Sequence, residues 1–209
     1  SAIPYGSAPN KSTIETNGNN IYVTYTLDSS KWGTDAVFRL YPDEGNAYWY
    51  TVGFDSSNYF LKANTDISQA LPRTHETNIA TAAYDADHKE YYWALKGTPY
   101  NLKLINMYHG DGYFLGVPKA NTASLASTYL LSDNSSNNVT WEMVDGLKYD
   151  NTYPYLRLQK SLNGEVGSNG SPLYIRRNWQ GTFSPILHDR TDGNCQVYFT
   201  HKVTTEITG

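Results

Sequence analysis

The sequence contains a single cysteine, Cys195, and few charged residues. One cysteine cannot form a disulfide within the chain, so we expect Cys195 to be a small buried hydrophobic residue or, failing that, to bridge to another chain. Charged residues make up 17% of the sequence, whereas globular domains average roughly 25%. The formal net charge is −4 and basic residues form no cluster, so we expect no nucleic-acid partner.

Long apolar runs are also absent from the sequence. No stretch approaches the roughly 18 consecutive apolar residues of a membrane helix, so no membrane insertion is expected. The sequence begins at Ser1 without a charged segment followed by an apolar one, which is the pattern of a mature or trimmed chain. On composition, we expect a secreted or cell-surface protein.

The motifs of common catalytic and metal sites are missing as well. The five histidines are scattered, and no two stand at the i, i+4 spacing of zinc ligands on one helix. The sequence has no Gly-x-Ser-x-Gly elbow and no glycine-rich phosphate loop before a helix. We therefore predict a protein that is not an enzyme and needs no metal or cofactor. A pair of distant carboxylates, as in glycosidases, leaves no local trace and stays open.

What replaces the charged residues is Asn, Ser, Thr, Gly and 19 tyrosines. Tyr and Thr favour pleated strands, whereas Asn, Ser and Gly favour turns. Residues 21–27 alternate apolar and polar side chains, as a half-buried strand does, and residues 37–41 repeat the pattern. The best helical window, residues 67–84, contains Pro72, so at most one short helical turn is expected there. The sequence predicts an all-β domain.

A weak internal repeat runs through residues 48–199. Each of its three units has roughly 50 residues and four expected strands, with a tight turn between the first two. The second strand reads Tyr-Phe-Leu-Lys at 59–62 in the first unit and Tyr-Phe-Leu-Gly at 113–116 in the second. We expect the aromatic residue of each last strand to be buried. In order, these aromatic residues are Trp93, Trp141 and the pair Tyr198-Phe199.

These features resemble the β-trefoil fold, and within it the ricin-type and fungal lectin branch, over about residues 38–203. A single four-stranded unit cannot bury its own apolar face, but three units about a pseudo-threefold axis can close a barrel. We place an N-terminal extension or added hairpin at residues 1–37 and the β-trefoil-like part of a single domain at 38–209. Residues 1–37 could instead begin a differently registered first unit. A β-sandwich, in which hairpins alone produce the periodicity, is the alternative fold.

The resemblance implies a sugar site between the first hairpin turn of a repeat and the turn before its last strand. In ricin-type lectins that last turn has Asp or Asn shortly before a Gln-x-Trp motif. The third unit is similar in Asp192, Asn194 and Gln196, but it has Tyr198 and Phe199 where the tryptophan is expected. The first two units have Asp or Asn before their tryptophans but no Gln. The strict ricin-type pattern is therefore not met.

Trp179 stands in a polar loop with no apolar periodicity around it, beside Arg176 and Asn178. An exposed tryptophan there could stack against the apolar face of a sugar, or its ring could fold back over the barrel. Arg176, with its neighbour Arg177, could pair with an acidic sugar. A solvated strand end is the plainer interpretation of the two arginines.

A second polar and aromatic group lies in the predicted turn between the first two strands of the second unit. It consists of Tyr108, His109 and Asp111. Sugar sites combine an aromatic face with polar groups that hydrogen-bond the hydroxyls, because a buried unpaired hydroxyl is costly. The Gly-Asp-Gly stretch at 110–112 fits a hairpin turn better than a phosphate loop.

From the sequence we predict a non-catalytic carbohydrate-binding protein, a lectin or carbohydrate-binding module with shallow loop sites, whose partners are glycans or glycoproteins. The alternative is a protein-binding trefoil. It would inhibit a protease through a loop such as residues 68–77, or serve as the receptor-binding domain of a toxin or adhesin. A structural domain of a larger surface protein is the third possibility.

Overall fold

The computed structural model is built almost entirely of β-strands, so the all-β prediction is confirmed. The two 3₁₀ helices of the described residues are short, η2 (Ala86–Tyr91) and η5 (Gly193–Cys195). No helical turn occurs in the described part of window 67–84, and η2 lies just beyond it. The structure describes residues 10–17, 20–27, 36–40, 49–54, 59–72, 79, 81–98, 101–119, 127–144, 155–158, 173–177, 183–187 and 193–202, with the backbone alone for those before residue 49 and for 183–187.

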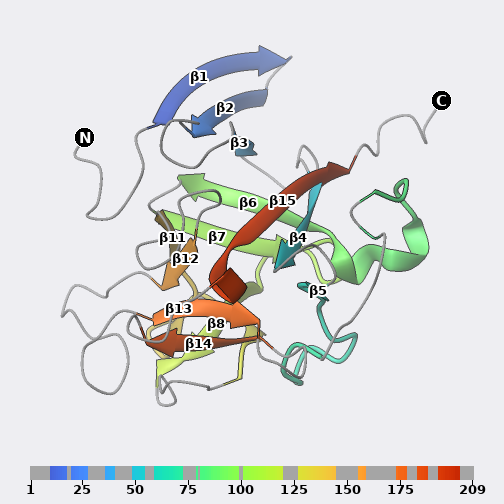
Figure 1. The fold of residues 1–209 in the computed structure, drawn as a ribbon, viewed down its shortest axis with the longest axis vertical. Coiled ribbons are helices and arrows are strands. Elements are labelled where there is room, and N and C mark those ends of the chain that lie inside the picture. The colour runs from blue at the N-terminus through green and yellow to red at the C-terminus, as the bar shows by residue number, and fades with distance from the viewer. Residues whose placement is uncertain are drawn as a thin grey trace.

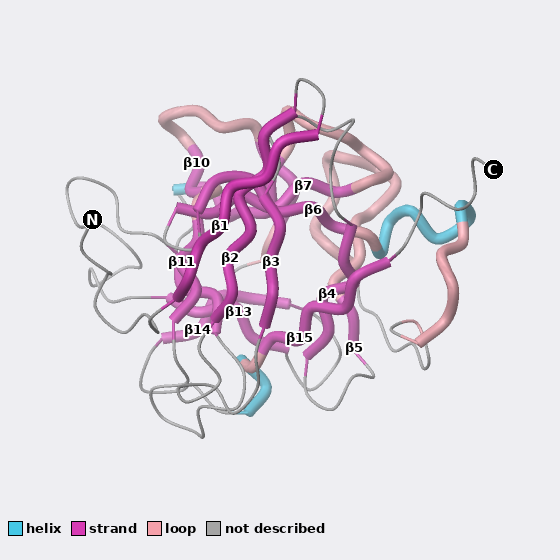
Figure 2. Tube along the Cα trace, turned by 90° about the horizontal axis from the view of Figure 1, so that it is seen from above, coloured by secondary structure: helices cyan, strands magenta, loops and turns pink. Residues whose placement is uncertain are grey.

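An antiparallel sheet of three strands stands over one end of the molecule (Figure 1). It comprises β1 (Asn10–Asn17), β2 (Asn20–Leu27) and β3 (Ala36–Leu40). The two strands that the alternating pattern predicted are β2 and β3. The strand β3 pairs with β2 and packs beside β6 of the main sheet (Figure 2). The boundary that we placed between residues 37 and 38 falls inside β3.

Six strands of the main sheet are those predicted to begin and end the three units. Their antiparallel pairings follow the order β12-β11-β7-β6-β4-β15, which joins each unit to the next in a nearly closed, barrel-like sheet. The six strands are β4 (Trp49–Phe54), β6 (Trp93–Thr98), β7 (Asn101–Asn106), β11 (Trp141–Val144), β12 (Tyr155–Leu158) and β15 (Val197–Lys202).

The remaining strands lie outside these six. The short β5 (Tyr59–Phe60) pairs with β4, and β13 (Leu173–Arg177) pairs with both β12 and β14 (Phe183–Leu187). A separate sheet places β8 (Phe114–Pro118) between β9 (Tyr129–Leu131) and β10 (Asn137–Asn138). Each unit therefore adds its middle strands outside the six-stranded path.

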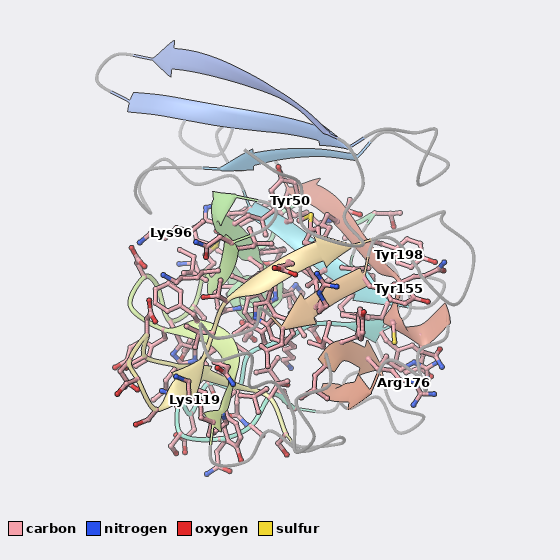
Figure 3. All side chains as sticks on the ribbon, turned by 90° about the vertical axis from the view of Figure 1, so that its left-hand side faces the viewer. Tyr50, Lys96, Lys119, Tyr155, Arg176 and Tyr198 are labelled. Carbon is pink, nitrogen blue, oxygen red and sulfur yellow. The ribbon has the colours of Figure 1, made fainter. Side chains whose placement is uncertain are left out.

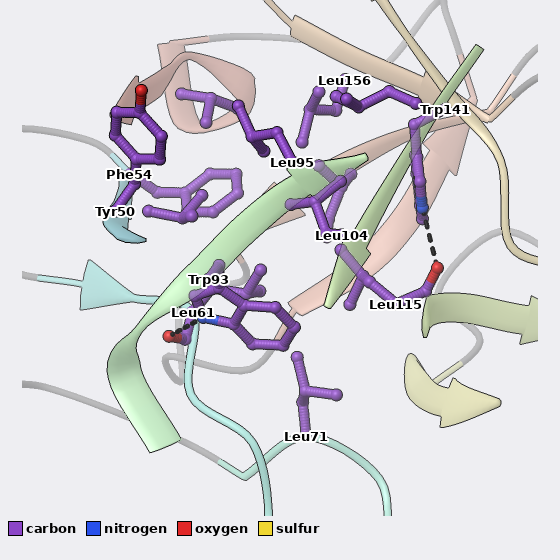
Figure 4. Close-up of a cluster of buried hydrophobic side chains, with 14 of the residues drawn as sticks. Tyr50, Phe54, Leu61, Leu71, Trp93, Leu95, Leu104, Leu115, Trp141 and Leu156 are labelled. Atoms are coloured by element: carbon purple, nitrogen blue, oxygen red, sulfur yellow. Dashed lines mark hydrogen bonds between the residues drawn. The ribbon is translucent and has the colours of Figure 1, made fainter. Parts of the chain in front are cut away.

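Two tryptophans make the same contact in the first and second units (Figure 4). Trp93 and Trp141 have no exposed surface, which confirms the prediction that both belong to the core. The indole N–H of Trp93 donates to the carbonyl of Leu61, and that of Trp141 donates to the carbonyl of Leu115, each at 2.9 Å. Because the two leucines occupy matching positions of the repeat, the first two units share one packing arrangement.

The pairing between first and last strands also repeats. Trp93 lies opposite Tyr50 of β4, and Trp141 lies opposite Leu102 of β7. All four residues belong to the largest hydrophobic cluster. In the third unit the first and last strands, β12 and β15, are both described and do not pair with each other, so this pairing is seen in the first two units.

Cys195 is fully buried against Tyr155 and Tyr174. Its thiol is free. The prediction of a small buried hydrophobic residue is therefore confirmed, and its burial argues against a bridge to another chain.

Candidate functional site

The exposed aromatic residues of the described chain gather in one segment. Among the residues whose side chains are described, the large hydrophobic ones with exposed rings are Tyr108, 49% exposed, and Tyr113, 41% exposed. Both lie in the segment that connects β7 to β8, where the sequence predicts a turn. Gly110 and Gly112 have φ values of 77° and 106° there, in the region that favours glycine. The Gly-Asp-Gly stretch forms a turn, as predicted, but it is not a hairpin turn, because β7 and β8 belong to different sheets and do not pair.

The buried side chain of Asn106 fixes the start of this turn. Its amide donates to the carbonyl of Glu90 at 2.8 Å and to that of Tyr92 at 3.4 Å. Its side-chain oxygen accepts from the backbone N–H of Tyr108 at 3.0 Å, and its backbone carbonyl accepts from Gly110 at 2.8 Å. The turn that presents Tyr108 is thus ordered from inside, which reduces the entropy lost when a ligand binds.

His109 ties the same turn to the first unit. Its Nε2 lies 2.6 Å from the backbone carbonyl of Asn64, in the loop that follows β5. The His109 ring meets the ring of Tyr108 edge to face, with centroids 4.9 Å apart. His109 therefore supports the exposed Tyr108 ring from one side.

Asp111 adds a carboxylate to the turn. Its oxygens accept from the ammonium of Lys96 at 3.0 and 3.3 Å, and one of them accepts from the Gly112 N–H at 2.9 Å. The Lys96 and Asp111 side chains are 35% and 33% exposed. The result is a hydrogen-bond donor on β6 next to an acceptor on the segment that bears Tyr113.

The equivalent position of the first unit is closed. Tyr59 matches Tyr113 in the repeat, two residues before the leucine that receives the tryptophan hydrogen bond. The guanidinium of Arg177 lies 4.1 Å from the centroid of the Tyr59 ring and also donates to Asn194 at 2.9 Å. A cation covers the ring in the first unit, whereas the ring of the second unit is open.

The site predicted in the third unit is described only in part. Arg176 is half-buried at the end of β13, and Asn194, in η5, is engaged by Arg177. Gln196 is buried, with 7% of its surface exposed, so little of its amide could reach a ligand at the surface. The remaining predicted residues of this unit, Asn178, Trp179 and Asp192, lie outside the described residues.

The described members of the two predicted groups do not meet. Lys96, the partner of Asp111, and Arg176 lie on opposite sides of the molecule (Figure 3). The structure brings Tyr108, His109 and Asp111 together around one turn.

Sequence reasoning missed three residues of this turn site: Lys96, Asn106 and Tyr113. The signal for Tyr113 was its position beside two glycines, which places an aromatic ring at a turn. Lys96 left no local signal, because its partner Asp111 lies fifteen residues further along the chain. Asn106 did leave one, because its side chain accepts from the N–H two residues on, the local contact that makes Asn frequent in turns.

Within the described part of the chain, no three His, Cys, Asp or Glu residues are placed to hold a metal ion. No helix in that part is long and apolar enough to cross a membrane.

No protein-family model matches the chain, and no curated protein matches it. Among solved structures, the chain is similar to the crystal structure of a designed 3-fold symmetric protein, ThreeFoil. The TM-score is 0.49 and the identity 16%, over 75% of this chain and 99% of that chain. No functional statement follows from a likeness of this size.

Proposed function

We propose that the chain is a non-catalytic carbohydrate-binding protein of β-trefoil architecture. Two features support the trefoil: the order of the six sheet strands, and the matched hydrogen bonds of Trp93 and Trp141. Three such units around one axis would give the closed barrel that the resemblance implies. Glycans or glycoproteins, met outside the cell or at its surface, are the proposed partners.

The observation that carries the binding proposal is the pair of exposed tyrosines, Tyr108 and Tyr113, on one ordered turn. An aromatic ring in water offers an apolar face, and the C–H face of a sugar ring can cover it. Asp111 and Lys96 supply an acceptor and a donor for hydroxyl groups beside it. Such a site is shallow, and its selectivity comes from the polar groups rather than from enclosure.

A binding role fits these groups better than catalysis does. The Asp111 carboxylate accepts from Lys96 and from the Gly112 N–H, so its charge is already compensated. A general acid or a nucleophile needs a carboxyl group that is available to the substrate. The pair is suited to holding hydroxyls in place.

Glycan-array binding followed by calorimetric titration of the sugar that binds tests this proposal. Tyr108→Ala and Tyr113→Ala each remove a stacking ring, and we expect each to weaken binding by about tenfold or more. Tyr108→Phe and Tyr113→Phe keep the ring and serve as matched conservative variants, with affinities near that of the wild type. Tyr198→Ala is the control. Tyr198 is a half-buried residue of β15 on the opposite side of the molecule from Lys96 (Figure 3), so this variant should leave binding unchanged.

Silence on the array, together with tight inhibition of a protease, would favour the protein-binding alternative. Of the loop proposed for that role, residues 68–72 and the neighbouring Ile79 are described. Leu71 is buried in the main core and its N–H donates to the carbonyl of Thr128 at 2.9 Å. Leu71 anchors this loop, whereas Ser68 and Gln69 before it are exposed.

A further inference from the structure

A second ion pair lies beside the turn site. Lys103 of β7 stands directly opposite Lys96 of β6 in the antiparallel register. Like charges at directly opposed positions destabilise a sheet. Here each ammonium is held by an aspartate from a different loop, because Lys96 pairs with Asp111 at 3.0 Å and Lys103 pairs with Asp133 at 2.8 Å.

Both lysines also lie against one aromatic ring. The Lys96 and Lys103 ammonium groups are 5.8 and 5.5 Å from the centroid of Phe114, whose own surface is 6% exposed. Phe114 follows Tyr113 directly in the chain. The lysines of the two ion pairs therefore both contact the Phe114 ring, next to the exposed Tyr113.

The second pair remains accessible. The Lys103 and Asp133 side chains are 28% and 49% exposed. Exposed ion pairs contribute little to stability, about 0–1 kcal/mol. The small stability that these ion pairs add therefore does not explain why two lysines lie opposite each other.

We propose that the Lys103–Asp133 pair is a second polar subsite, and that the ligand is a neutral oligosaccharide of at least two sugar units. This inference rests on the proposed function. Each lysine–aspartate pair offers a donor beside an acceptor, which matches two neighbouring hydroxyls of a sugar. Directly opposed residues of an antiparallel sheet are about 4.5–5.5 Å apart between Cα atoms, close to the span of one sugar ring.

The same pairs select against charged sugars. An anionic sugar would have to separate a lysine from its aspartate and would meet the repulsion of Asp111 or Asp133. A neutral sugar can bridge donor and acceptor without breaking the pair. The surface therefore favours glucose-, galactose- or mannose-type units over uronic or sialic acids.

Calorimetry with galactose, glucose, mannose and N-acetylglucosamine, and with lactose, cellobiose, mannobiose and diacetylchitobiose, tests the subsite. The double variant Lys103→Gln/Asp133→Asn removes both charges with little change of volume. We expect it to weaken disaccharide binding by about tenfold while monosaccharide binding changes less than about twofold. The double variant Lys89→Gln/Asp87→Asn, on exposed η2, makes the same chemical change elsewhere and should leave both affinities unchanged.

The outcomes separate the two proposals. If wild-type protein binds neither these sugars nor any glycan of the array, the proposed function fails. If it binds array glycans but none of these neutral disaccharides, the inference of a neutral-oligosaccharide subsite fails. If it binds them but the Lys103→Gln/Asp133→Asn variant, with an unchanged melting temperature, loses nothing or loses both classes equally, the second subsite is overturned. Tighter binding of glucuronic acid than of glucose would overturn the assignment to neutral sugars.

Discussion

At the scale of single residues, buried hydrogen bonds explain both the core and the order of the turn site. Trp93 and Trp141 each close a strand contact through one indole N–H. Asn106 makes four hydrogen bonds that fix the turn that bears Tyr108. A buried polar group without a partner is costly, so each of these residues specifies one local arrangement.

Replacing each of the two tryptophans by phenylalanine tests whether Trp93 and Trp141 have the same role. Trp141→Phe keeps an aromatic ring but leaves the buried carbonyl of Leu115 without its donor. We expect a loss of about 1–3 kcal/mol in the free energy of unfolding. Trp93→Phe should cost a similar amount through Leu61. Urea denaturation of both variants measures the two losses, and a large cost at one position with none at the other would contradict the matched roles.

Tyr92 predicts how stability falls at alkaline pH. Burial raises the pKa of the Tyr92 phenol above its usual 10.0, although the N–H of Asp85, which donates to the phenol oxygen, opposes this. The folded chain therefore holds this proton more tightly than the unfolded chain. The resulting stabilisation is complete below the unfolded pKa and is lost as pH rises through the folded pKa.

Urea denaturation between pH 8 and about 11.5 of wild-type protein and the Tyr92→Phe variant measures this effect. The variant loses about 1 kcal/mol at pH 8, because the Asp85 N–H loses its acceptor. Above pH 10 its stability should decline less steeply than that of the wild type. Parallel declines would show that Tyr92 does not titrate as described.

At the scale of elements, alanine substitutions at two glycines distinguish the cost of backbone strain from the cost of a steric clash. Gly97, at the end of β6, has φ of 109°, and a Cβ there would lie 2.2 Å from the backbone oxygen of Asn101. Gly112, in the turn site, has φ of 106° but open space around the added atom. Strain of this kind costs of order 1–3 kcal/mol, so Gly112→Ala should lose about that much stability.

Gly97→Ala should lose clearly more, since the β6–β7 hairpin must also shift its backbone. Thermal unfolding of the two variants gives the order of the costs. Equal melting temperatures would mean that the hairpin absorbs the contact. Because Gly112→Ala reshapes the turn between Tyr108 and Tyr113, it should also weaken sugar binding.

Several elements were predictable because their information is local. Alternation marked β2 and β3, and the matching Tyr-Phe-Leu segments gave the second strands of the first two units. The pairing of Lys96 with Lys103 was not predictable, since it depends on the register of β6 against β7. The contact of Arg177 with the Tyr59 ring joins segments more than a hundred residues apart, so no local sequence pattern predicts it.

At the scale of the whole molecule, the first two units share a core arrangement but differ at the surface. The core contacts of the first two units are alike, but the Tyr59 ring is covered and the Tyr113 ring is open. The repeat therefore predicts the scaffold, while departures from the repeat create the proposed binding surface. This is why sequence similarity between units located the core tryptophans and left most of the site undetected.

We propose that a sugar binds at the turn between β7 and β8. A nuclear magnetic resonance titration of isotope-labelled protein with the sugar that binds on the array locates the bound sugar. We expect the amide shifts to concentrate in residues 106–114 and around Lys96 and Asn64, which contact this turn. Shifts confined to residues 173–199, or the absence of any shift at saturating sugar, would contradict it.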